Sequence, residues 1–192
     1  MTDKILIVIP SLEPDEKLVE LTGELKREGF SHILIVNDGS GPAYDDIFAR
    51  AVAEGDCRLL THSVNQGKGR AMKTAFNEFL LHPDGCEGVV TVDSDGQHRP
   101  ADIRKCCEAL LAHPDSLILG SRNFDEKGVP LKSSFGNKLT RKIFGFLSGI
   151  HIRDTQTGLR GFSPALVRRF LSTPGERFEY EMNMLMDCRE YN

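Results

Sequence analysis

The 192-residue sequence has no tryptophan, only five cysteines and no long hydrophobic run. The cysteines are odd in number and form no C-x-x-C pair, which disfavours a disulfide framework and a zinc site. We therefore expect reduced cysteines that serve in packing. No apolar stretch approaches the ~20 residues that a membrane-spanning helix needs. The start, MTDKILIVIP, lacks a small-residue cleavage site, so we expect a first strand and a cytoplasmic protein rather than a signal peptide.

Charge is unevenly distributed along the chain. The formal net charge of −4 excludes a uniformly basic nucleic-acid binder. Residues 127–169, however, contain nine Lys or Arg side chains and a single acid, Asp154. An asymmetry of this size indicates a face prepared for an anionic partner, and it fits a solvated basic face without a partner equally well.

Short apolar runs alternate with stretches of helical period over the first 120 residues. The runs that we expect to form strands are Ile5–Ile9, Ile33–Val36, Arg58–Thr61, Val89–Val92 and Leu117–Leu119. The stretches between them predict four amphipathic helices, and the last of these begins at Pro100, a residue suited to a first helical turn. This alternation predicts an α/β fold, a mostly parallel sheet with helices on both faces.

The alternation stops after Gly120. There the sequence predicts a helix over residues 135–147, a short strand over 150–152, a loop over 154–161 and two further helices. We expect a single domain over residues 1–192, composed of a first half, 1–122, and a second half, 123–192. The final residues carry no cap or closing strand, which indicates a chain cut from a longer polypeptide.

Polar clusters follow the predicted strands at the points where the strands end. Because the carboxyl ends of parallel strands meet at one edge of a sheet, these clusters should converge on one binding cleft. They are Pro10-Ser11-Leu12-Glu13, Asn37-Asp38-Gly39-Ser40, Asn65-Gln66-Gly67-Lys68-Gly69, Asp93-Ser94-Asp95-Gly96-Gln97-His98 and Gly120-Ser121-Arg122.

Two carboxylates in the fourth cluster suit a metal ion. Asp93 and Asp95 alternate just past an apolar strand, so both can reach into the cleft. Carboxylate oxygens fit Mg²⁺ or Mn²⁺, and Gln97 can supply a neutral oxygen ligand. Read alone, Asp-x-Asp-Gly is also compatible with a turn that caps the next helix.

Other cleft residues suit phosphate and a base or sugar. The loop around Lys68 offers backbone N–H groups and a positive charge to a phosphate. It matches neither a Walker A loop nor G-x-G-x-x-G. Arg122 adds a rigid fork suited to phosphate oxygens. Asp38 can accept a hydrogen bond from a base or a sugar hydroxyl, or it can form an ordinary Asx turn. Together with the metal ligands, these residues predict a nucleoside diphosphate ligand.

In this order and spacing the motifs resemble those of family 2 glycosyltransferases with the GT-A fold. The matching segments are IVIPSLEP, VNDGS, NQGKGRA, VDSDGQH, GSR, DTQTGLRGF and FEYEMNML. The sequence is most similar to the branch that contains dolichol-phosphate mannose synthases and bacterial polyprenyl-phosphate glycosyltransferases. The resemblance implies a Rossmann-like, mostly parallel nucleotide-binding sheet, in which residues 1–122 bind the nucleotide sugar and 123–192 face the acceptor.

The resemblance also implies roles for individual residues, with Mg²⁺ or Mn²⁺ as cofactor. Donor-binding residues would be Pro10, Glu13, Asp38, Lys68, Asp93, Ser94 and Arg122. Metal ligands would be Asp93, Asp95 and Gln97. Acceptor-side residues would be Asp154, Gln156 and Arg160. Catalytic residues would be Asp95, Asp154 and Arg122. The sequence departs from the commoner family pattern at SLEP and at Asn37, so the choice between UDP and GDP stays open.

The implied activity is inverting transfer of a sugar from a UDP- or GDP-sugar to a polyprenyl phosphate, at the inner face of the cell membrane. A lipid phosphate is already ionised near neutral pH, so Asp154 would position a substrate rather than act as a strong base. The predicted helix over 135–147 mixes apolar side chains with Lys138, Arg141 and Lys142. That mixture is typical of a helix on an anionic membrane, and it also fits a helix packed on the sheet.

Two other functions fit parts of the pattern. In a phosphotransferase of the haloacid dehalogenase type, Asp93 and Asp95 would supply a nucleophile and an acid/base. Such enzymes have Thr or Val where Gln97 stands, and they carry the motif on an early strand. A non-catalytic nucleotide-binding module would be expected to lack metal ligands, whereas Asp93, Asp95 and Arg122 are all present.

Overall fold

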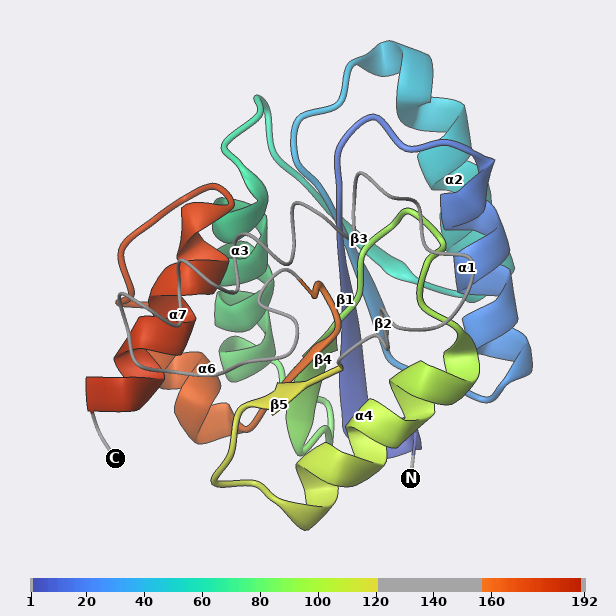
Figure 1. Cartoon of the computed structure of the whole chain (residues 1–192). Coiled ribbons are helices and arrows are strands. Elements are labelled where there is room, and N and C mark those ends of the chain that lie inside the picture. Colours follow the sequence, from blue (N-terminus) through green and yellow to red (C-terminus); the bar gives the residue numbers. More distant parts are fainter. Residues whose placement is uncertain (1, 121–156, 191–192) are drawn as a thin grey trace, which may run out of the picture.

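A six-stranded sheet forms the centre of the computed structural model, which describes residues 2–120 and 157–190 (Figure 1). The strands are β1 (Ile5–Ser11), β2 (Ile33–Asn37), β3 (Arg58–Thr61), β4 (Gly88–Thr91), β5 (Ile118–Leu119) and β6 (Arg160–Phe162). Their order is β3-β2-β1-β4-β6-β5. Strands β1 to β4 pair in parallel, whereas β6 runs antiparallel to both of its neighbours.

Helices cover both faces of the sheet (Figure 1). One face carries α1 (Glu16–Arg27), α2 (Asp45–Gly55) and α4 (Pro100–Ala112), and the other carries α3 (Lys68–Leu81), α6 (Pro164–Phe170) and α7 (Glu179–Glu190). Short 3₁₀ turns span Thr2–Lys4 and Pro42–Tyr44. The expected α/β fold is confirmed. Among the described residues, no helix has the length and apolar character needed to cross a bilayer.

The central strand β1 shows why the sheet needs both layers of helices. Ile5, Ile7 and Ile9 pack with α1, α2 and α4, whereas Leu6 and Val8 pack with α3, α6 and α7. A parallel strand that is covered on both faces is apolar at every position rather than at alternate ones. The unbroken apolar run that predicts this strand therefore reflects two separate cores.

Local signals in the sequence determine where the helices begin. The Asp15 side chain accepts a hydrogen bond from the backbone N–H of Lys17 at 3.0 Å and caps α1. Pro100 occupies the first position of α4, as expected. The five cysteines, all within the described residues, are free, and four of them are buried, which confirms their role in packing.

The structure departs from the sequence-based expectation after Gly120. Strand β6 begins inside the segment 154–161 that was expected to be a loop, and Gly161 pairs with Val90 on one side and Ile118 on the other. Three residues, R-G-F, are too few to show a period of two, so the pattern gave no sign of a strand. The two later helices are confirmed as α6 and α7, and the predicted helix over 135–147 and strand over 150–152 lie outside the described residues.

The aromatic cluster around β6 provides a test of this packing. The Phe162 ring lies edge-on to Phe76, with centroids 5.0 Å apart, and to Phe170, at 5.9 Å, and it has no exposed surface. We expect Phe162→Ala to lower the free energy of unfolding by about 3–5 kcal/mol, measured by urea denaturation. The matched control Phe178→Ala removes a ring that is 75% exposed and should cost less than about 0.5 kcal/mol. Equal losses in the two variants would contradict this core assignment.

Candidate active site

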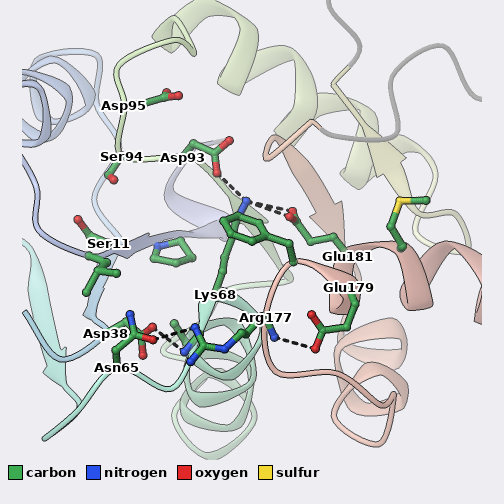
Figure 2. A pocket seen from close by; sticks show the side chains of 16 residues that line it. Ser11, Asp38, Asn65, Lys68, Asp93, Ser94, Asp95, Arg177, Glu179 and Glu181 are labelled. Atoms are coloured by element: carbon green, nitrogen blue, oxygen red, sulfur yellow. Dashed lines mark hydrogen bonds and ion pairs between the residues drawn. The ribbon is translucent and has the colours of Figure 1, made fainter. Parts of the chain in front are cut away.

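A cavity of about 710 Å³ opens at the carboxyl ends of the parallel strands (Figure 2). Its walls come from the ends of β1, β2 and β4, the loop before α3 and the chain around the start of α7. This volume is in the range of small-molecule and cofactor sites. Six predicted site residues line the cavity: Pro10, Asp38, Lys68, Asp93, Ser94 and Asp95. The clusters that follow the first four strands therefore meet in one place, as expected.

Of the remaining predicted site residues, those that the structure describes do not line this cavity. Glu13 is exposed beyond the end of β1. Gln97 is also exposed, and its backbone N–H donates to Asp95 Oδ1 at 3.0 Å. Arg160 is completely buried beneath the site. Arg122, Asp154 and Gln156 lie outside the described residues.

Inside the cavity, the Lys68 ammonium lies between two carboxylates (Figure 2). Its Nζ is 2.8 Å from Asp93 Oδ1 and 3.1 Å from each carboxylate oxygen of Glu181. Burial alone would lower the pKa of Lys68, but the charges of Glu181 and Asp93 raise that pKa above its usual value. Lys68 is therefore positively charged in this site.

The Asp93 carboxylate is fixed by close neighbours. Burial alone would raise the pKa of Asp93, but His98 and the Lys68 ammonium lower it well below its usual value. A Cβ atom at Gly158 would lie 2.0 Å from Asp93 Oδ2, so only glycine leaves room for this carboxylate. Asp93 is therefore an ionised group with little freedom to move away from its partners.

Arg160 holds Glu181, the second carboxylate beside Lys68, in place. Its Nε donates to the carbonyl oxygen of Thr157 at 2.9 Å and lies 3.6 Å from Glu181 Oε1. Its Nη1 donates to the backbone carbonyl of Glu181 at 2.8 Å. Arg160 thus reaches the site through Glu181 rather than by facing the cavity. Lys68, Asp93, Glu181 and Arg160, which we call the charge cluster, contain two positive and two negative groups.

Asp38 anchors the loop that leads into α3. Its Oδ1 accepts from the backbone N–H of Gln66 at 3.0 Å and lies 2.8 Å from His62 Nδ1. Its Oδ2 accepts from the backbone N–H of Gly67 at 2.7 Å. These bonds give the carboxylate a structural role, in addition to its place in the cavity wall.

The first turn of α3 is covered by the chain just before α7. The backbone N–H of Arg70 donates to the carbonyl oxygen of Glu176 at 2.9 Å. At Gly67, where φ is +103°, a Cβ atom would lie 2.4 Å from that same oxygen. Within the G-K-G loop that we expect to offer N–H groups to a phosphate, the N–H of Gly67 donates to Asp38 Oδ2. The N–H groups of Gln66 and Arg70, on either side of that loop, also donate to protein acceptors.

The side-chain oxygens in the cavity could act as ligands of a divalent cation that binds together with a diphosphate. In the part of the chain that the structure describes, no three His, Cys, Asp or Glu side chains gather into a metal-binding cluster. Mg²⁺ sites at phosphate substrates commonly use one or two carboxylates and complete their coordination with phosphate oxygens and water. Asp93 and Asp95 line one cavity. The buried Nε2 of His98 lies 3.8 Å from Asp93 Oδ2 and has no hydrogen-bond partner among the described residues.

Comparison with known proteins identifies the family of this chain. The model of glycosyl transferase family 2 matches residues 7–172. An uncharacterised protein of Methanocaldococcus jannaschii is 30% identical over 98% of this chain and 77% of its own length. The UDP-N-acetylglucosamine–dolichyl-phosphate N-acetylglucosaminyltransferase of Methanococcus voltae is 28% identical over 88% of this chain and 73% of that protein. The polyprenol monophosphomannose synthase of Mycolicibacterium smegmatis is 29% identical over 84% of this chain and 62% of that protein.

A solved structure agrees with the fold. Glucosyl-3-phosphoglycerate synthase from Mycobacterium tuberculosis, in complex with Mn²⁺, UDP and glucosyl-3-phosphoglycerate, superposes with a TM-score of 0.74 at 20% identity. The match covers 98% of this chain and 66% of that one. The chain therefore belongs to glycosyl transferase family 2 and is a glycosyltransferase, and its resemblance to the polyprenyl-phosphate branch is confirmed. The phosphotransferase and non-catalytic alternatives are not retained.

No role was predicted for Glu181, His98 or Gly158. Glu181 belongs to a segment that matched the family, and it is a carboxylate on a helix whose neighbouring Tyr180 and Met184 are fully buried. A charge inside such an apolar stretch is a signal that could have identified it, because buried charges need partners. For Gly158 only the fold reveals the reason, since its contact with Asp93 joins distant parts of the sequence.

Because Asp93 is ionised in the folded chain, the free energy of unfolding should depend on pH in the acidic range. Because its pKa is lowered from the unfolded value of about 3.9, its contribution to stability is present above about pH 4 and is lost as the pH falls through the lower folded-state pKa. Between about pH 4 and pH 2, the free energy of unfolding should therefore fall less steeply for Asp93→Asn than for the unmodified chain. Urea denaturation at a series of pH values measures this slope.

Lys68→Met is the companion variant for this titration, because the Lys68 ammonium helps to hold Asp93 in its ionised form. It should reproduce part of the flattening that Asp93→Asn causes. An unchanged slope in both variants would show that Asp93 contributes nothing to the acid dependence.

Proposed function

We propose that this chain transfers a sugar from a nucleoside-diphosphate sugar to a polyprenyl phosphate, with Mg²⁺ or Mn²⁺ as cofactor. The observation that carries the proposal is the joint placement of Asp93, Asp95 and Lys68 in one 710 Å³ cavity at the carboxyl ends of parallel strands. This edge of an open α/β sheet is where nucleotides bind. The structural relative was solved with Mn²⁺ and UDP, which favours a donor of the same chemical class.

Residues from different walls of the cavity would bind different parts of the nucleotide sugar. Asp93 and Asp95 would hold the metal ion, which neutralises charge on the departing diphosphate when it is bound. Lys68 would add a second positive charge close to the same oxygens. Pro10 and Asp38, at the ends of β1 and β2, would contact the base and the ribose.

A polyprenyl phosphate suits this site as the acceptor. Relatives of this chain are named for transfer to dolichyl phosphate and for synthesis of polyprenol monophosphomannose. A phosphate oxygen of the acceptor bonds to the anomeric carbon as the bond from that carbon to the diphosphate breaks, which inverts the configuration at that carbon. The acceptor is already an anion, so the reaction needs no strong base.

The cavity rim adds an apolar surface next to the charged centre. Phe178 and Leu12 line the cavity and are 75% and 45% exposed, respectively. Such a rim fits an acceptor that combines a phosphate with a hydrocarbon chain. Contact with an anionic membrane through the basic segment 127–169 belongs to the same proposal.

The acceptor assignment is tested by supplying two acceptors side by side. With Mn²⁺ and UDP-N-acetylglucosamine, UDP-glucose or GDP-mannose, we expect labelled sugar to enter the lipid phase when undecaprenyl phosphate is present. EDTA should abolish the transfer, and excess Mn²⁺ should restore it. Transfer to 3-phosphoglycerate with none to undecaprenyl phosphate would contradict the lipid acceptor.

Metal dependence is tested at the more exposed carboxylate. Asp95→Asn should keep the fold, because the side chain is exposed, and should lower transfer at least about a hundredfold, because an amide is a poorer and uncharged ligand. Circular dichroism and the same transfer assay measure the two effects. Asp102→Asn, on the exposed surface of α4, is the control and should keep full activity. Normal Mn²⁺-dependent transfer by Asp95→Asn would refute the metal assignment.

A further inference from the structure

Lys68 neutralises the carboxylate that a metal ion would use. Lys68 Nζ pairs with Asp93 Oδ1 at 2.8 Å, and the two side chains are only 17% and 24% exposed. A cation that binds Asp93 therefore competes with a partly buried ion pair. Coulomb attraction between such partly buried groups is stronger than in water.

We propose that Lys68 and the divalent cation exchange places at Asp93, so that the cation binds weakly alone and tightly together with the nucleoside diphosphate. This inference rests on the proposed function and assigns a gating role to Lys68. When a cation binds at Asp93, the Lys68 ammonium leaves that carboxylate and turns to the diphosphate. Glu181 is the positioning residue that keeps Lys68 beside the site during the exchange.

The charge balance of the charge cluster supports the exchange. Its two cations and two anions already cancel. A divalent cation that bound alone would leave a net positive charge next to Lys68 even with the carboxylate of Asp95 counted, and like charges repel strongly in a partly buried site. A negatively charged diphosphate that arrives with the cation compensates this charge. Metal and nucleotide should therefore each strengthen the binding of the other by the same factor.

Differences in freedom within the charge cluster decide which group moves. Arg160 has no exposed surface and is tied by hydrogen bonds to two backbone carbonyls. Asp93 is confined by Gly158. Lys68 carries its charge on a flexible four-carbon stem and lines the cavity, so it is the group that can turn. Glu181, only 8% exposed and 3.6 Å from Arg160 Nε, stays in place as its counter-ion.

The test measures Mn²⁺ binding without nucleotide, by calorimetry or electron paramagnetic resonance, and then repeats the measurement with UDP and with GDP. Lys68→Met should bind Mn²⁺ alone about tenfold more tightly, or about 1.4 kcal/mol. It should bind the nucleotide in saturating Mn²⁺ more weakly. The factor by which the nucleotide strengthens Mn²⁺ binding should therefore fall.

Arg177→Gln is the matched control for the loss of charge. Arg177 lines the same cavity, but its Nη1 donates to Asn65 Oδ1 at 3.2 Å rather than to Asp93. The affinity of the Arg177→Gln variant for Mn²⁺ alone should differ less than threefold from that of the unmodified chain. An equal gain in Arg177→Gln and Lys68→Met would reduce the effect to general electrostatics and overturn the exchange.

Two further variants test Glu181 and guard against misfolding. Lys68→Arg keeps the charge and should retain weak binding of Mn²⁺ alone. Glu181→Gln removes the second partner of Lys68, which then pairs with Asp93 alone. In an otherwise unmodified chain it should therefore weaken Mn²⁺ binding, and in a Lys68→Met background its effect should be smaller. Identical effects of Glu181→Gln in both backgrounds would show that Glu181 does not act through Lys68. Thermal melts accompany each variant.

The outcomes separate this inference from the proposed function. If the unmodified chain binds Mn²⁺ and a nucleoside diphosphate together, but Lys68→Met leaves the binding of Mn²⁺ alone unchanged, the exchange is wrong and the glycosyltransferase site stands. If Mn²⁺ and nucleotide never bind together, the proposed metal-dependent function fails and the exchange fails with it.

Discussion

The ion pairs of Lys68 with Asp93 and Glu181 determine how the active site is assembled, because the three residues come from distant parts of the sequence. Lys68 begins α3, Asp93 follows β4 and Glu181 lies in α7. A partly buried charge is tolerated only when it is paired, so Lys68 needs the two carboxylates as counter-ions and each carboxylate is stabilised by Lys68. Arg160, held by backbone carbonyls, fixes Glu181 from below. The position of α7 relative to the parallel strands is thus coupled to the charge state of the cavity.

The strands and α-helices of residues 2–120 could be predicted from sequence because they have strong local signals, whereas the two short 3₁₀ turns were not predicted. The run Ile5–Ile9 is apolar at every position, and Asp15 and Pro100 mark the starts of α1 and α4. Strand β6 had no such signal. Arg160, Gly161 and Phe162 become a strand only because β4 and β5 supply partners on both sides. Tertiary pairing rather than propensity determines that short segment.

In the candidate site, too, some residues could be predicted from sequence and others could not. Asp93, Asp95 and Lys68 could be found because each follows a strand at the edge where parallel strands end, and that rule depends only on the order of elements. The hydrogen bonds of Asp38 to the loop before α3, and the contact of Gly158 with Asp93, depend on how distant loops approach one another. One sequence cannot reveal such an approach, although Glu181, a charge next to apolar residues in the segment FEYEMNML, could have been recognised as a site residue.

The chain around the start of α7 completes the cavity that we propose binds the sugar donor. Arg177, Phe178 and Glu181 line it together with residues from the ends of β1, β2 and β4, and the carbonyl oxygen of Glu176 meets the first turn of α3. The cavity proposed for the donor is therefore not a module separable from the later part of the chain. A chimera that exchanged residues 123–192 with those of a relative, in order to change the acceptor, would also rebuild one wall of the nucleotide site. Donor preference and acceptor preference should consequently change together when such segments are recombined.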